Sequence, residues 1–97
     1  MNIIVIGDRD TVTGFRLAGV EGWHVDTPEE AGAALERALA APDVGLILIT
    51  ERWAAAMRPR VEAARRRIMP LVVEIPDRRG PIDEVSLTRK VHSIIGI

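Results

Sequence analysis

The amino-acid sequence predicts an α/β fold, an open sheet of four parallel strands flanked by helices on both faces. One observation is a set of uninterrupted apolar runs, which are typical of strands buried on both faces. Another is that segments with helical periodicity separate these runs, so strands and helices alternate along the chain. Parallel strands joined by right-handed crossovers are the arrangement that such alternation favours. The predicted strands are residues 3–6, 23–26, 44–49 and 71–75.

The first strand and the helix after it come from residues 2–19, which read NIIVIGDRDTVTGFRLAG. Gly7 ends the strand, and a polar turn rich in helix-capping residue types follows it. We expect a short helix from Thr11 or Val12 to Ala18.

That helix carries two kinds of apolar side chain. At 100° per residue, Val12, Phe15 and Gly19 share one face, which is expected to pack on the sheet. Leu17 points about a third of a turn away from this face. It therefore has no predicted contact within the chain.

The second unit pairs a weak strand with a well-signalled helix. Because residues 23–26 form only a short strand, an edge position in the sheet is expected. Thr27 is the predicted N-cap of the helix, with Pro28 in its first turn and Glu30 closing a capping box. Pro42 ends this helix. Its apolar stripe consists of Ala31, Ala34, Leu35, Ala38 and Leu39.

A proline interrupts the third helical segment, which Thr50 can cap. Pro59 removes a backbone donor and clashes with the preceding turn. We predict a kink, or a break into two short helices with Pro59 opening the second. Pro76 ends the fourth strand. The residues that keep the helical period are Ala54, Met57, Val61, Ala64 and Ile68.

The last part of the sequence predicts a loop at residues 77–81 and a helix from about residue 84 or 86 to 95. Gly96 can supply its C-cap. One face of this helix is apolar, with Leu87, Val91, Ile94 and Ile95. The prediction is thus a single domain of residues 1–97, with an α/β core (1–76) of Rossmann-like or receiver-like shape and a C-terminal loop and helix (77–97).

Composition excludes several classes of function. A chain of 97 residues corresponds to one domain, and its net charge of −1 provides no general attraction to nucleic acid or anionic lipid. The lack of cysteine excludes a disulfide framework and thiol catalysis. Met1 leads directly into strand residues, so no signal peptide is expected. The longest apolar run, residues 44–49, is too short to cross a bilayer, and membrane association is expected only through a partner.

Nucleotide binding is not indicated. A dinucleotide-binding fold needs G-x-G-x-x-G in the first turn between strand and helix, where the backbone approaches the pyrophosphate. Here Asp8 and Arg9 follow Gly7, and the next glycine is Gly14. A P-loop motif is also absent from the sequence.

A phospho-receiver domain is the closer alternative, because its fold is similar. Asp8 and Asp10 could supply its acidic pair. However, the third strand leads into Thr50 and Glu51 instead of an acceptor aspartate. Pro76 stands where that chemistry needs a lysine, and a fifth strand is missing.

Other polar and aromatic residues give weaker signals. His24 and His92 lie far apart and lack neighbours at metal-ligand spacing, so no metal site is predicted. Trp23 and Trp53 are equally consistent with partial burial at sheet edges and with interface anchors. A basic cluster is best interpreted as a solvated helix face, and contact with an acidic protein is the second interpretation. The cluster comprises Arg58, Arg60, Arg65, Arg66 and Arg67.

Four motifs follow one another along the chain: GDRDTVTGFRLAG, then DVGLILITE, then PLVVEIP, and finally IIGI. These motifs and their order resemble the F subunit of the A-type and V-type (archaeal/vacuolar-type) rotary ATPases. The resemblance implies a non-catalytic rotor protein in the central stalk that binds the coiled-coil D subunit, with the catalytic A/B hexamer nearby. It implies coupling of ATP hydrolysis or synthesis to proton or sodium transport, a cytoplasmic location peripheral to the membrane, and no cofactor.

The resemblance also selects candidate binding residues. The partner-binding motif would be Gly14, Phe15, Arg16, Leu17 and Gly19. The C-terminal helix, with Leu87, Val91, Ile94 and Ile95, would be a regulatory or partner-binding element. The competing hypothesis is a stand-alone receiver-like domain for signalling or ligand binding.

Overall fold

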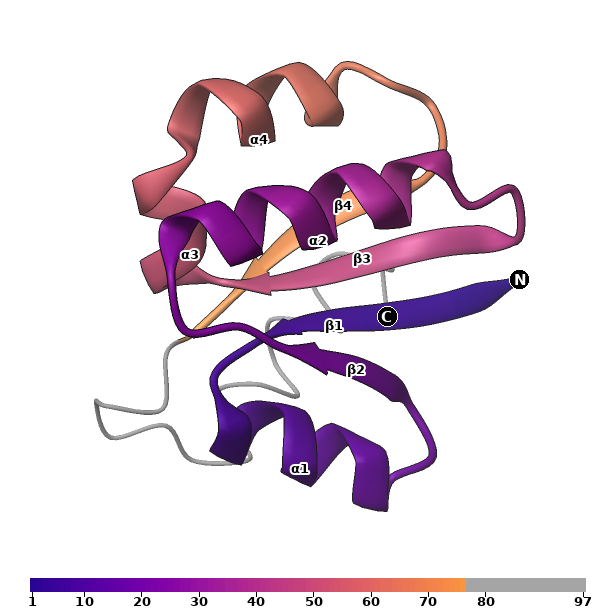
Figure 1. Cartoon of the computed structure of the whole chain (residues 1–97). Coiled ribbons are helices and arrows are strands. Elements are labelled where there is room, and N and C mark those ends of the chain that lie inside the picture. The colour runs from indigo at the N-terminus through magenta and orange to yellow at the C-terminus, as the bar shows by residue number, and fades with distance from the viewer. Residues whose placement is uncertain (77–97) are drawn as a thin grey trace.

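The structure, a computed structural model, describes residues 1–76 and confirms an open sheet of four parallel strands (Figure 1). The strand order is β2-β1-β3-β4. Along the chain the elements are β1 (Asn2–Gly7), α1 (Arg9–Leu17), β2 (Glu21–His24), α2 (Pro28–Ala40), β3 (Val44–Thr50), α3 (Glu51–Ala56), α4 (Arg58–Arg65) and β4 (Leu71–Ile75).

Helices cover both faces of the sheet, as predicted. Helix α1 lies on one face, and α2, α3 and α4 lie on the other (Figure 1). The connection from β1 to β2 runs in one direction across the sheet, and the connection from β2 to β3 runs back past β1. Right-handed crossovers in opposite directions place their helices on opposite faces, so α1 and α2 are separated by the sheet.

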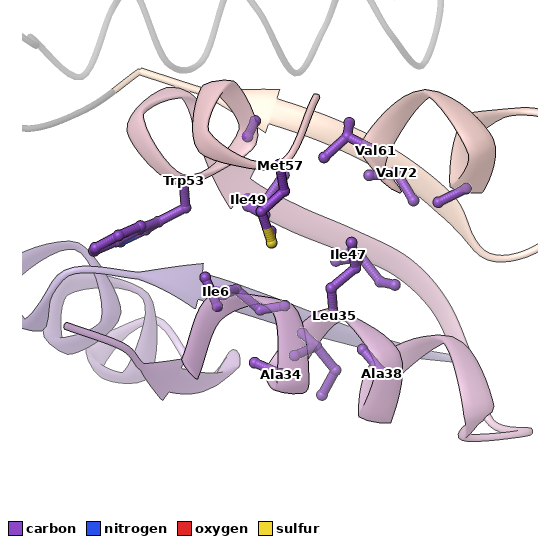
Figure 2. Packing of buried hydrophobic residues seen from close by; sticks show 14 of the residues in the cluster. Ile6, Ala34, Leu35, Ala38, Ile47, Ile49, Trp53, Met57, Val61 and Val72 are labelled. Atoms are coloured by element: carbon purple, nitrogen blue, oxygen red, sulfur yellow. The ribbon is translucent and has the colours of Figure 1, made fainter. Parts of the chain in front are cut away.

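The apolar runs are buried because the two faces of each central strand enter different clusters. Ile4 and Ile6 of β1 belong to the larger cluster, beneath α2, α3 and α4, and Val5 belongs to the smaller one beside α1. Leu35, Trp53 and Val61 contribute to the larger cluster from the helices (Figure 2). The other buried members of the smaller cluster within residues 1–76 are Val12, Leu48, Val73 and Ile75.

Strand β2 occupies a sheet edge, as predicted, but it both begins and ends two residues earlier than the predicted 23–26. Glu21 and Gly22 belong to the strand. The register pairs Gly22 with Val5 of β1. A Cβ atom at position 22 would lie 2.7 Å from Cγ1 of both Val5 and Val12. Gly22 is therefore required by the close approach of α1 to the sheet.

The predicted helix signals at Thr27 and Pro59 are confirmed. The Thr27 hydroxyl oxygen accepts a hydrogen bond from the Glu30 backbone N–H at 3.1 Å, while the Glu30 carboxylate accepts from the backbone of Asp26. Met57 separates α3 from α4, and Pro59 lies in the first turn of α4. There its missing N–H leaves no helical hydrogen bond broken. Thr50 does precede α3, but its side chain makes no capping hydrogen bond.

Candidate partner-binding surface

Helix α1 begins before the predicted start at residue 11 or 12, because Asp8 caps it. The Thr11 backbone N–H donates to Asp8 Oδ2 at 3.2 Å, and the Thr11 hydroxyl donates to Oδ1 at 2.6 Å. Partial burial raises the pKa of the Asp8 carboxyl, but the hydrogen bonds from Thr11 and from the backbone N–H groups of the same turn together outweigh it and hold the pKa below its ordinary value. Asp8 therefore has a local structural role.

Gly19 ends α1. The helical wheel had placed it on the sheet-facing side with Val12, and this prediction is wrong. Gly19 lies beyond the helix with φ +87°, a conformation that favours glycine. The Gly19 N–H donates to the Arg16 carbonyl at 3.0 Å, and the Val20 N–H donates to the Phe15 carbonyl at 2.9 Å. This is a Schellman motif, so the turn itself explains the glycine.

The remaining residues of the predicted motif lie on different sides of α1. Phe15 is half-buried and packs against the smaller core cluster. Leu17 is 86% exposed, which confirms that it has no place in the core. Gly14 is also exposed, and a Cβ atom built on it would meet nothing within 4 Å. Gly14 and Leu17 are three residues apart and share the outward face of α1.

Arg16 does not form an outward-facing pair with Leu17. Its Nη2 donates a hydrogen bond to the backbone carbonyl of Gly22 at 2.7 Å. Arg16 is four residues after Val12 and so emerges on the same side of α1. The guanidinium therefore binds the edge strand of its own sheet, a contact that sequence spacing gave no reason to expect.

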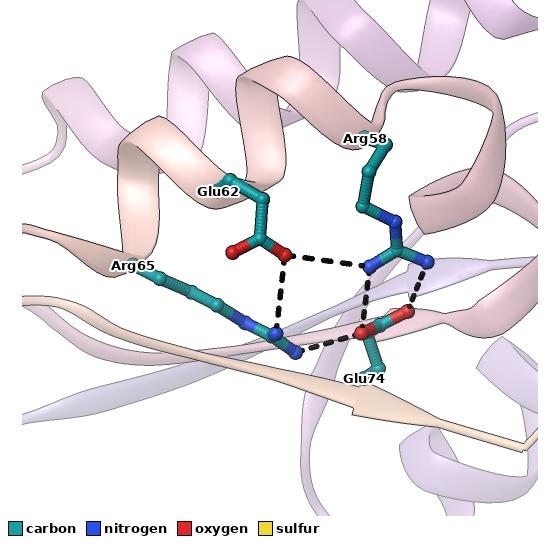
Figure 3. A network of polar contacts seen from close by, with 4 residues as sticks. All are labelled: Arg58, Glu62, Arg65 and Glu74. Atoms are coloured by element: carbon teal, nitrogen blue, oxygen red, sulfur yellow. Dashed lines mark hydrogen bonds and ion pairs between the residues drawn. The ribbon is translucent and has the colours of Figure 1, made fainter.

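The basic cluster predicted to be a solvated face is partly bound within the chain (Figure 3). Arg58 of α4 makes two hydrogen bonds of 2.9 Å to the Glu74 carboxylate of β4, and Arg65 makes a third of 2.7 Å. Glu62 adds ion pairs to Arg58 at 3.7 Å and to Arg65 at 3.4 Å. The hydrogen bond from Arg58 is the main cause that lowers the pKa of Glu74. These contacts tie α4 to β4.

The two tryptophans also have roles within the chain. Trp53 is a core residue at 5% exposure. Trp23 is half-buried, and the guanidinium carbon of Arg37 lies 4.5 Å from its ring centroid. His24 contacts Asp26 at 2.8 Å near the same edge.

Two features of the described surface bear on the binding of metals and small ligands. Within residues 1–76, no group of three or more His, Cys, Asp or Glu side chains could hold a metal ion. An open hollow of about 330 Å³ lies at the amino end of the sheet, away from the carboxyl ends of the strands where α/β folds bind ligands. It is lined by Met1, Asn2, Ile3, Gly19, Val20 and Glu21.

Two further points concern the predicted location and the predicted regulatory element. No helix in the described part of the chain is both long and apolar enough to cross a membrane. The predicted C-terminal helix, with Leu87, Val91, Ile94 and Ile95, lies outside the described residues.

Comparison with known proteins identifies relatives over nearly the whole chain. The A-type ATP synthase F subunit of Methanothermobacter thermautotrophicus is 40% identical, over 99% of this chain and 93% of the relative. The corresponding F subunit of Pyrococcus abyssi is 41% identical, over 100% of this chain and 96% of the relative. The crystal structure of the V-type ATP synthase F subunit of Archaeoglobus fulgidus matches with a TM-score of 0.65 and 26% identity. That match covers 76% of this chain and 95% of the other.

The family assignment follows from these relatives together with a family-wide match. The family described as ATP synthase (F/14-kDa) subunit matches residues 3–91, which is most of the chain. The fold, the order of the motifs and the length agree with that match. The chain is therefore a member of the family of A/V-type ATP synthase F subunits.

Proposed function

We propose that this chain is a non-catalytic rotor component of the central stalk, which binds the coiled-coil D subunit and turns with it inside the A/B hexamer. ATP hydrolysis or synthesis takes place on other chains, and the rotor couples it to transport of protons or sodium ions. The chain is cytoplasmic and peripheral to the membrane as part of this complex. Membership of the family of F subunits is the main support for this role.

The observation that carries the choice of surface is Leu17. It is a large apolar side chain with 86% exposure, and it lies on a helix that is otherwise anchored by a cap at each end. The neighbouring Gly14 leaves the helix backbone bare on the same face. A coiled coil presents a ridged helical surface, and a glycine beside a leucine allows such a surface to approach closely. We therefore place the contact with the D subunit on the outward face of α1.

Each residue of the predicted motif takes a distinct part in this proposal. Leu17 is the anchor, and Gly14 is the point of close approach. Phe15 and Gly19 hold α1 in shape through the core and the terminal turn. Arg16 contributes mainly within the chain, through its hydrogen bond to the Gly22 carbonyl. The C-terminal helix is retained as a proposed regulatory or partner-binding element.

The test is titration of the D subunit with the Leu17→Asp variant. A carboxylate placed in an apolar contact should weaken binding by at least ~2 kcal/mol, about thirtyfold. The melting temperature should change little, because the side chain is exposed in the free chain. The matched control is Ile68→Asp, since Ile68 is equally apolar and 93% exposed but follows α4.

Three results would contradict the proposal. Equal loss of affinity in both variants would indicate a nonspecific effect of charge. Unchanged affinity in Leu17→Asp would place the contact elsewhere. Failure of the wild-type chain to co-purify with the D subunit at all would favour the receiver-like alternative.

A further inference from the structure

The outer edge of β2 carries backbone groups that β1 does not use. β2 lies at an edge of the described sheet and pairs only with β1 there. The Val25 backbone N–H donates to the Gly7 carbonyl at 3.0 Å, so the inward-facing groups are those of Val25 and, two residues earlier, Trp23. The N–H and C=O groups of Gly22 and His24 therefore point away from the sheet.

These outward groups are complementary to a second copy of the same strand. In an antiparallel pair related by a two-fold axis at Trp23, Gly22 of each copy lies opposite His24 of the other. Each such pair exchanges two hydrogen bonds, which satisfies all four outward groups of each strand. The two Trp23 side chains would lie directly across from each other, and aromatic cross-strand pairs are stabilising. A strand edge that presents such groups is a template for association.

Two arginines flank this edge from opposite faces of the sheet. Arg16 reaches it from α1, and its guanidinium donates a hydrogen bond of 2.7 Å to the outward carbonyl of Gly22. Arg37 comes from α2 and lies over the Trp23 ring at 4.5 Å. A second copy would have to displace Arg16 from that carbonyl, and it would bring two more guanidinium groups towards the first two.

We propose that the outer edge of β2 is a self-complementary strand-pairing surface and that Arg16 keeps it closed to a second copy of this chain. Arg16 thus has a role of its own in preventing edge-to-edge association, separate from any contact with the D subunit. Charged side chains at edge strands are a common means of blocking such pairing. Here the charge also binds the acceptor that an incoming strand would need.

The test compares the isolated wild-type chain with Arg16→Ala by sedimentation velocity over rising protein concentration. The wild type should stay at its monomer mass of 10.6 kDa, whereas the variant should approach twice that mass. Arg9→Ala is the matched control, because Arg9 is an exposed arginine on the same helix. It should behave as the wild type does.

A second substitution tests whether association uses the edge of β2. His24→Pro removes an N–H that faces away from β1, and proline is accepted at edge positions whose N–H faces solvent. The double variant Arg16→Ala/His24→Pro should return to the monomer mass. In Arg16→Ala, exchange of the Gly22 and His24 amide protons should slow by about tenfold or more on association.

Specific results would overturn the proposal. A folded Arg16→Ala chain that remains monomeric at every concentration would do so. So would association that persists in the double variant, or that appears equally in Arg9→Ala. If alanine at position 16 unfolds the chain, Arg16→Met keeps the aliphatic stem and removes the donor, and the same outcomes then apply to it. Because the D subunit is left out of the assay, the result is independent of the proposed stalk function.

Discussion

Replacing Gly14 by alanine should change the stability of the free chain and its affinity for the D subunit in opposite directions. Gly14 lies inside α1, and an added Cβ would meet nothing within 4 Å. Relative to alanine, glycine in a helix interior costs roughly 0.5–1 kcal/mol. For a domain of this size, that gain should raise the melting temperature of the free chain by roughly 2–8 °C.

The same methyl group should weaken binding to the D subunit. If the coiled coil packs against the bare backbone at position 14, the extra volume should cost about 1–3 kcal/mol. The dissociation constant should then rise roughly five- to 150-fold. Calorimetric titration against the D subunit measures the affinity, and thermal melting by circular dichroism measures the stability. Opposite signs in the two assays are the expected result.

Gly19→Ala is the matched control for this experiment. Gly19 is also exposed with open space around it, but its φ of +87° strains any residue that carries a Cβ. Its substitution by alanine should lower the free energy of unfolding by about 1 kcal/mol, and the melting temperature should fall accordingly. A Gly14→Ala variant that is both more stable and fully competent for binding would refute the proposed contact. A destabilised Gly14→Ala would show that the outward face of α1 is already covered within the chain.

Three further outcomes are expected. Leu35→Ala should cost about 2–5 kcal/mol in urea unfolding, because Leu35 is fully buried; a smaller loss would mean that the core collapses around the cavity. Glu74→Gln should lower the melting temperature at pH 7. Because Arg58 depresses the pKa of Glu74, the carboxylate stabilises the fold above its unfolded pKa near 4.5, and this contribution is lost as pH falls through the lower folded value. The difference between wild type and Glu74→Gln should therefore close in melts below pH 4.5, and a constant difference would contradict this reasoning. Calorimetry with ATP and with ADP at millimolar concentration should give no saturable heat, since the first turn lacks a phosphate-binding glycine motif; a micromolar dissociation constant would show that the chain has a nucleotide site without that motif.

Much of the fold could be predicted because its signals are local. The apolar runs predict the strands. Their alternation with helices predicts that the strands are parallel and that helices cover both faces of the sheet. Thr27 and Pro59 act within one turn of their own positions, and both predictions were confirmed. The start of α1 was missed because Asp8, Asp10 and Thr11 are all good capping types. Only the extended backbone of Asp8 distinguishes it from Thr11.

The contacts that were missed join residues on different elements. Nothing in the sequence around Gly22 indicates that a helix packs against it, since a glycine after a glutamate is equally typical of a turn. The reach of Arg16 to the edge strand depends on a long side chain whose direction the sequence does not reveal. The ion pairs of Glu74 connect it to arginines of the preceding helix. One signal was available for this residue, because an acidic residue within an apolar strand requires a partner.

The close contact between Val12 and position 22 also bears on how this protein can diverge. A Cβ atom at position 22 would lie 2.7 Å from Cγ1 of both Val5 and Val12, so position 22 cannot vary independently of the other two. Shortening the branched side chain at 12 alone removes only one of the two collisions, because Val5 lies equally close. Residues 5, 12 and 22 should therefore covary among relatives that keep this helix on this strand. A lineage that acquires a side chain at position 22 must first make room at both valine positions, which gives the order of the substitutions a preferred direction.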